Sequence, residues 1–133
     1  MASERLVDDA TIADASELWR RINALWVVRD GNTGNSRASS AAFSDSRDGS
    51  PTSVLLADSV RETGRTAKDV IAGHDGHALS SITAGQARGC EQGVARHALP
   101  KEPAHAYIFG HKTKALRRCL AKQAKWVIAP AAP

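Results

Sequence analysis

Cysteine is scarce in this chain of 133 residues, which contains only Cys90 and Cys119. There is no Cys-x-x-Cys pair, and no group of cysteines and histidines has the spacing of a zinc site. The turn His74–His77 carries ligand-type side chains but has no matching pair elsewhere. We therefore expect neither a disulfide framework nor a metal site, and we predict that both thiols lie in the core.

Long apolar runs are also missing, so no segment approaches the length that a membrane-spanning helix needs. The first residues are acidic and amphipathic, which is not the pattern of a secretory signal. We therefore expect a cytoplasmic protein with no membrane partner.

Cofactor and catalytic motifs are absent too. No glycine pattern of a nucleophile elbow surrounds Ser39 or Ser40. Aromatic residues make up 5% of the chain, and they do not gather into a stacking surface for bases. The sequence thus names no cofactor and matches no standard nucleic-acid-binding module.

What is present is a globular composition, with 42% hydrophobic and 24% charged residues. A chain of this size buries one core without disulfide or metal support. We predict a small single domain of the α+β class over residues 1–129, in which a sheet of short strands is covered by three to five helices. Residues 30–51 form a long polar loop, and residues 130–133 form a flexible tail.

Helix signals occur at several points. The capping-box spacing at Asp14 and Glu17 predicts a helix to about Asn23, with Leu18 and Ile22 on its apolar stripe. Further helices are predicted from Thr66 to Gly73, from Thr83 to Gln92 and after Thr113, each with threonine as its cap. The segment after Ser50-Pro51 remains open, because it fits either a helix that ends at Gly64 or a strand over 53–57.

Strand signals separate these helices. We predict strands around Val27, over Ala78–Thr83, over Ala104–Phe109 and over Trp126–Ile128, and an extended piece from Val94. Within the polar loop, residues 37–43 form a short strand or turn held by Phe43. In the strand that ends at Phe109, alternation places His105, Tyr107 and Phe109 on one face.

Positive charge is concentrated near the C-terminus, although the formal net charge is only +4. The helix after Thr113 is predicted to carry its bases on one stripe, and these bases are Lys114, Arg117, Arg118, Lys122 and Lys125. Such a surface attracts phosphates or an acidic protein partner. The leading hypothesis is an interaction module whose cationic helix binds nucleic acid or another polyanion.

Two other functions are consistent with the sequence. The first is a small transferase or hydrolase acting on a nucleotide-like ligand, with His105 as the acid/base, His77 nearby and Ser40, Arg37 and Arg21 as ligand contacts. It predicts that these side chains converge on one pocket. The second is a protein-partner subunit, which an exposed apolar patch around Trp19 or Trp26 would favour.

Three segments carry a resemblance: Leu18–Ile22, then Arg37–Phe43 with Ser53-Val54, then Pro103–Ala106. Together they resemble a family of small uncharacterised bacterial proteins, which implies no activity. The chain is also similar to the ADP-ribosyltransferase superfamily, in which an early strand bears Arg or His and a later strand bears a serine-rich motif. This resemblance implies NAD as a ligand, with Arg20 or Arg21 and Ser39-Ser40 in those places and His105 in place of the catalytic glutamate.

Overall fold

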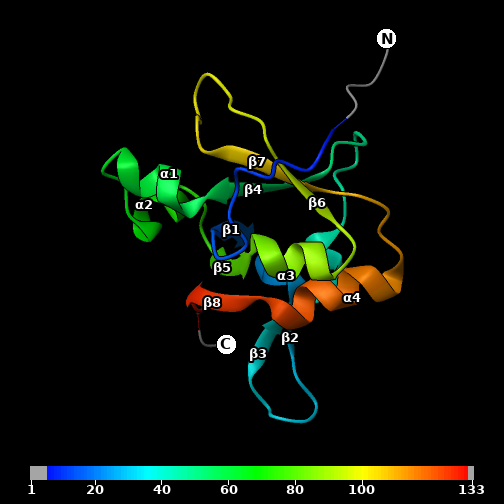
Figure 1. Cartoon of the computed structure of the whole chain (residues 1–133). Helices are drawn as coiled ribbons and strands as arrows, with labels where there is room; N and C mark the ends of the chain where they lie inside the picture. Colours follow the sequence, from blue (N-terminus) through cyan, green and yellow to red (C-terminus); the bar gives the residue numbers. More distant parts are fainter. Residues whose placement is uncertain (1–5, 132–133) are drawn as a thin grey trace.

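A six-stranded antiparallel sheet organises the chain in the computed structural model, which describes residues 6–131 (Figure 1). The strand order is β6-β7-β4-β1-β5-β8, and a separate two-stranded hairpin is made by β2 and β3. The strands of the sheet are β1 (Glu17–Ile22), β4 (Thr52–Leu56), β5 (Ala78–Thr83), β6 (Gly93–Arg96), β7 (His105–Phe109) and β8 (Lys125–Ile128). The fold is therefore α+β, as the composition predicts.

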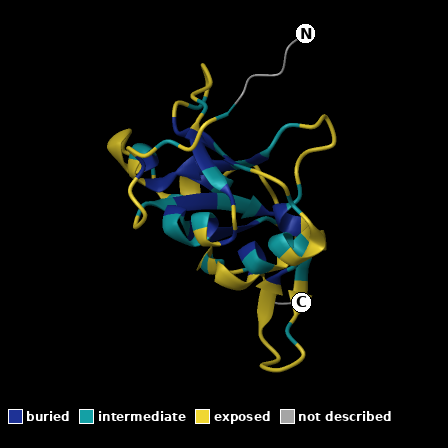
Figure 2. Cartoon of the chain, turned by 45° about the vertical axis from the view of Figure 1, so that its right-hand side comes forward, coloured by how far each residue is buried: buried dark blue, intermediate teal, exposed yellow. Residues whose placement is uncertain are grey.

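Helices cover both faces of this sheet. Beside the hairpin strands β2 (Val27–Arg29) and β3 (Ser36–Ala38), the other elements are α1 (Ala57–Glu62), α2 (Ala67–Ile71), α3 (Ala84–Gly89), α4 (Lys114–Gln123) and the 3₁₀ helices η1 (Ala24–Trp26) and η2 (Ser40–Phe43). One face packs against α3, α4 and η2 in the larger core cluster, and the other packs against α1 and α2 in a smaller one. Figure 2 shows the buried sheet between these exposed layers.

The first predicted helix is wrong, because Glu17–Ile22 forms the central strand β1. Leu18 and Ile22, four residues apart, fit a helix stripe, but they also lie on one face of a strand with Arg20 between them. Arg20 is tolerated there because its guanidinium donates to the backbone oxygens of Ala42 and Ser53. The predicted cap at Asp14 is absent as well, and the Asp14 carboxylate instead pairs with Arg88 at 2.6 Å.

The segment after Pro51 begins as a strand, which decides between the two interpretations of that segment. β4 ends at Leu56, and α1 follows directly and ends at Glu62. Of the two alternatives, the strand over 53–57 agrees with the structure, and the helix begins only at Ala57.

Local signals elsewhere are confirmed. Thr83 and Gln86 form a complete capping box at the start of α3, and Thr113 accepts from the Leu116 amide at the start of α4. Phe43 is fully buried at the end of η2 and holds residues 37–43 in place, as predicted. β3 and η2 thus lie within the predicted polar loop, whereas β2 lies just before it. The predicted tail falls partly on residues 132–133, outside the described residues.

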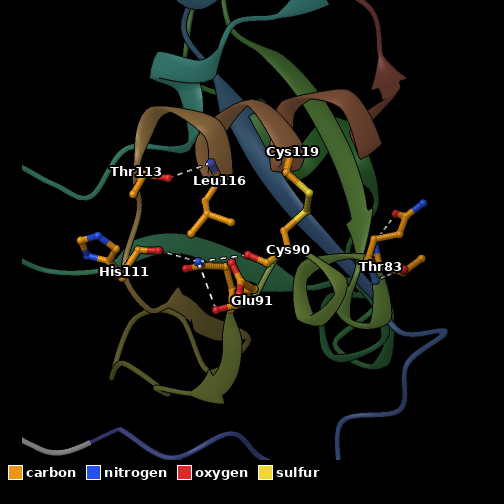
Figure 3. The surroundings of a disulfide bond; sticks show 9 residues. Thr83, Cys90, Glu91, His111, Thr113, Leu116 and Cys119 are labelled. Carbon is orange, nitrogen blue, oxygen red and sulfur yellow. Dashed lines mark hydrogen bonds between the residues drawn. A yellow bond between two sulfur atoms is a disulfide. The ribbon is translucent and has the colours of Figure 1, made fainter.

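The expectation of two unpaired thiols is wrong. Cys90 follows α3, Cys119 lies on α4, and the two form a disulfide with a Cα–Cα distance of 5.8 Å (Figure 3). Both residues were assigned to the core correctly, since Cys90 is 1% exposed and Cys119 packs against the same cluster. The two cysteines are separated by 29 positions and belong to no motif. They meet because β6 and β7, which lie between them in the chain, bring α4 back to α3.

Candidate functional site

A cationic groove lies between the β2–β3 hairpin and α4, with a cavity volume of about 630 Å³. Its bases are Arg29 and Arg37 from the hairpin and Arg118 and Lys122 from α4, and Asp30 is its only acid. Hydroxyl and amide groups of Asn32, Ser39 and Ser40 complete the polar lining. We call these residues the hairpin–helix groove.

The bases of this groove are available to a ligand. Within residues 6–131, no ion pair involves any of the four. Arg118 and Lys122 are four residues apart, so they lie on the same side of α4 and repel each other. An anionic ligand bound beside both bases would reduce this repulsion.

The remaining predicted bases of α4 lie elsewhere. Arg117 donates from Nη1 to the Ser44 hydroxyl at 3.2 Å, and Lys114 is exposed outside the groove lining. α4 ends at Gln123, so Lys125 belongs to β8. There it lines a separate cavity of about 110 Å³ beside Trp126. The structure therefore gathers two of the five predicted helix bases, together with Arg37, into one concave site.

A third cavity, of about 110 Å³, lies where β1 and β4 part. β1 is paired with β5 along all six residues, but with β4 only at Leu18 and Trp19. Beyond that point, the Ser53 carbonyl accepts from Arg20 Nη1 at 2.7 Å and not from the β1 backbone. Side chains that line the cavity include Arg21, Ser53 and His105. We call this the strand-split cavity.

His105 is held by three polar contacts. Its Nδ1 lies 2.9 Å from the His97 carbonyl oxygen and 3.1 Å from His97 Nδ1, and its Nε2 lies 3.1 Å from the Ser53 hydroxyl. A carbonyl oxygen only accepts, so Nδ1 carries the hydrogen and the neutral ring presents a lone pair from Nε2 to Ser53. Burial lowers the pKa of His105 below its ordinary value, despite the opposing effect of the His97 carbonyl, and this favours the neutral ring.

Arg21 is positioned from the neighbouring strand. Its Nε donates to the Val70 carbonyl of α2 at 2.7 Å, and its two terminal NH2 groups donate to no partner among residues 6–131. Burial lowers the pKa of Arg21, while the nearby Glu102 carboxylate opposes this effect, and the group stays charged. A bidentate pair of Arg65 with Glu102, at 2.7 and 2.6 Å, fixes the loop just before His105.

The predicted catalytic residues do not converge. Ser40 and Arg37 line the hairpin–helix groove, whereas His105 and Arg21 line the strand-split cavity on the other face of the sheet. His77 lies in the predicted turn before β5, where its ring contacts His74 edge-on at 5.5 Å. The single pocket expected for these five side chains is not formed.

Other predicted contacts have structural roles. Arg20 is surrounded by carbonyl groups and by Trp26, whose ring centre is 5.4 Å from the guanidinium carbon. Burial lowers its pKa to about 10, so it remains charged at neutral pH. Trp19 is 3% exposed, and Trp26 is half-buried. The two tryptophans themselves are not exposed, but Leu25 and Val28 beside Trp26 are exposed, so the protein-partner subunit stays a prediction.

Three further observations bear on function. No family model matches the chain, and no curated protein or solved structure is significantly similar to it. Within residues 6–131, no helix has the length and hydropathy that crossing a bilayer requires. The same residues contain no group of three or more histidine, cysteine or acidic side chains arranged to hold a metal ion.

Sequence reasoning missed Arg29, which completes the groove, and Ser53, which contacts His105. Arg29 stood in a short segment without a helix pattern, next to the polar loop. Ser53 had no motif around it, and it meets His105 only through the antiparallel pairing of β4 with β7, in which Leu55 lies opposite His105. No signal short of the strand order would have found this contact.

Proposed function

We propose that the chain binds a polyanion, with nucleic acid as the favoured ligand, in the hairpin–helix groove. The observation that carries this proposal is the convergence of four bases from two separate elements on one groove with a single acid. The proposed ligand site is therefore this groove, which includes Arg118 and Lys122 of α4, and not the whole cationic helix.

Phosphate recognition fits the chemistry of the lining. Arginine guanidinium groups bind phosphate oxygens through two parallel hydrogen bonds, and Arg29, Arg37 and Arg118 supply three such groups. The Ser39 and Ser40 hydroxyls and the Asn32 amide add uncharged donors. Few aromatic side chains lie in this region, so we expect contacts to the backbone of the nucleic acid and little preference for base sequence.

The test is a salt titration of binding. A fluorescein-labelled single-stranded DNA of about 20 nucleotides is titrated with the protein, and fluorescence anisotropy gives Kd. If four phosphates are contacted, log Kd should change with log salt concentration with a slope of about 3, so that affinity falls roughly 50-fold between 50 and 200 mM salt.

Matched charge reversals separate the groove from net charge. Arg118→Glu with Lys122→Glu changes the groove, and Lys68→Glu with Lys101→Glu makes the same change in charge at exposed sites outside the groove. We expect the first pair to abolish binding at 100 mM salt and the second to weaken it only slightly. Equal losses for both pairs, or no binding by the wild type at any salt concentration, would refute the proposal.

A second candidate is a small transferase or hydrolase acting on a nucleotide-like ligand such as NAD, with His105 as the acid/base. It is favoured by the extended conformation of Leu18–Ile22, which the similarity to ADP-ribosyltransferases requires, and by the cavity that Arg21 of this strand shares with His105. Calorimetric titration with NAD tests it. Binding should be lost in His105→Ala and Arg21→Ala and kept in Arg118→Glu, and no heat from the wild type would exclude NAD.

The cellular location belongs to the same proposal and is open to a simple test. A cytoplasmic protein keeps its thiols reduced, whereas the Cys90–Cys119 bond favours an oxidising compartment. Trapping the thiols by alkylation in intact cells, followed by mass spectrometry, decides between the two. Alkylated thiols would support the cytoplasmic prediction, and a protected pair would contradict it.

A further inference from the structure

We propose that Ser53 and His105 form a nucleophile–base pair that hydrolyses small carboxylic esters in the strand-split cavity. This site lies on the face of the sheet opposite the hairpin–helix groove, so the inference does not depend on polyanion binding. It assigns a nucleophile that the sequence did not indicate.

The first support is the direction of the hydrogen bonds. The His97 carbonyl accepts from Nδ1 of His105, which leaves the lone pair of Nε2 facing the Ser53 hydroxyl at 3.1 Å. A serine hydroxyl is weakly nucleophilic by itself and is activated by an adjacent base whose ring a third group orients. Here the orienting group is a backbone carbonyl, which holds the ring in the tautomer that a general base requires.

The second support is rigidity. Ser53 and His105 lie on adjacent strands, β4 and β7, that are paired along four residues, and the His105 ring packs edge-on against Tyr107 with ring centres 4.9 Å apart. The preceding loop is tied to α1 and α2 by the Arg65–Glu102 pair. Side chains on strands are positioned more accurately than those on free loops, and accurate positioning is what catalysis needs.

The third support is a cation beside the pair. Arg21 lines the same cavity, its Nε is anchored on Val70, and its terminal NH2 groups have no partner among the described residues. A positive group there stabilises the negative charge that develops on a carbonyl oxygen during attack. The cavity has a volume of about 110 Å³, which accommodates a small acyl group.

The reaction follows from these positions. Ser53 Oγ attacks the carbonyl carbon of the ester and gives its proton to Nε2 of His105, and the carbonyl oxygen becomes an oxyanion beside Arg21. The bond to the leaving oxygen then breaks, and His105 returns the proton to that oxygen, which leaves as an alcohol. Water attacks the acyl–Ser53 ester with His105 again as base, and the free acid departs as the proton returns to Ser53.

The experiment is covalent labelling of the folded chain by a small alkyl fluorophosphonate, with the labelled peptide located by mass spectrometry. Hydrolysis of p-nitrophenyl acetate is followed in parallel. We expect label on Ser53 and not on Ser59 or Ser81, which are half-exposed serines that no histidine contacts in the described structure. Ser59→Ala, on α1 and outside the linings of both sites, serves as the control and should label normally.

Two variants test the role of the histidine. His105→Gln keeps a polar side chain next to Ser53 but cannot take a proton, so labelling should slow by about 10²- to 10⁴-fold. A urea unfolding curve of the variant should show that it is still folded under the labelling conditions. In the wild type the rate should rise with pH, and the midpoint of the rise should lie below the ordinary histidine pKa of 6.5. The other ionisable groups that face the ring or its cavity are His97, Glu102, Tyr107, Arg20 and Arg21.

The outcomes are decisive. Absence of label on Ser53 in the folded wild type, or a labelling rate in His105→Gln equal to that of the wild type, would overturn the inference. Labelling that survives in Arg118→Glu with Lys122→Glu, a variant expected to bind no DNA, would show that the two sites act independently. Loss of DNA binding therefore cannot be mistaken for failure of the nucleophile.

Discussion

Reducing the disulfide between Cys90 and Cys119 should lower the stability of the fold by a large and calculable amount. The bond joins the end of α3 to the middle of α4, so it closes a loop that contains β6 and β7. In the unfolded chain this closure removes conformations that would otherwise be available. The folded state gains stability relative to that restricted ensemble.

The magnitude follows from the separation of the two cysteines. For a sequence separation of 29 between the bonded positions, the chain-entropy relation gives about 12 cal/mol/K, or about 3.6 kcal/mol at 25 °C. A typical urea dependence of about 1.5 kcal/mol per molar then predicts that reduction lowers the urea midpoint by about 2.4 M. For a chain of 133 residues, the corresponding fall in Tm is about 12 °C.

Equilibrium urea unfolding followed by circular dichroism, with and without dithiothreitol, measures this difference. The double variant Cys90→Ala with Cys119→Ala is the matched control, because it should unfold near the reduced wild-type midpoint and ignore the reductant. A loss smaller than about 1 kcal/mol on reduction would contradict the entropy argument. The protein can also be unfolded without reductant and treated with an alkylating reagent. If both cysteines are then alkylated, the disulfide is not formed.

Three further substitutions probe the fold. Asp45→Ala should cost about 1–3 kcal/mol, because it removes the acidic partner of the Lys112 ammonium, which is 4% exposed, and urea unfolding measures the loss. Thr83→Ala should cost about 1 kcal/mol, since it removes the cap of α3, while Ser81→Ala on the same strand should cost less. Hydrogen bonds from Arg65 lower the pKa of Glu102 below its ordinary 4.5, so their stabilisation is present above that pH and is lost on acidification. Glu102→Gln should therefore unfold with a weaker dependence on pH between 6 and 3 than the wild type, and an unchanged dependence would refute the pair's contribution.

The parts of the fold that could be predicted are those set by neighbours in the sequence. The caps at Thr66, Thr83 and Thr113 depend on bonds that span about three residues, and the bounds of β5 match the predicted strand. β1 was misassigned because the four-residue spacing of Leu18 and Ile22 fits both a helix and one face of a strand. Arg20 can lie between Leu18 and Ile22 because its guanidinium donates to carbonyl groups of η2 and β4, and the sequence does not show these contacts.

The candidate sites divide in the same way. His105 was found because imidazole chemistry marks it in any context, and Arg37, Arg118 and Lys122 were found through the charge pattern. Ser53 could not be found, because it contacts His105 only through the pairing of β4 with β7, and the two residues are 52 positions apart in the sequence. The groove as a concavity depends on where the hairpin folds relative to α4, and no local pattern encodes that placement.

The central place of β1 has a consequence for how the chain folds during synthesis. This strand emerges first, yet it pairs with β4 and β5, and the last residue of β5 follows it by about 60 positions. At a synthesis rate of roughly 5–20 residues per second, about 3–12 s pass between the synthesis of β1 and the completion of both partner strands. During that interval Leu18, Trp19 and Ile22 are exposed on an unpaired edge, so a ribosome-bound chain of this protein should need chaperone protection until Thr83 has emerged.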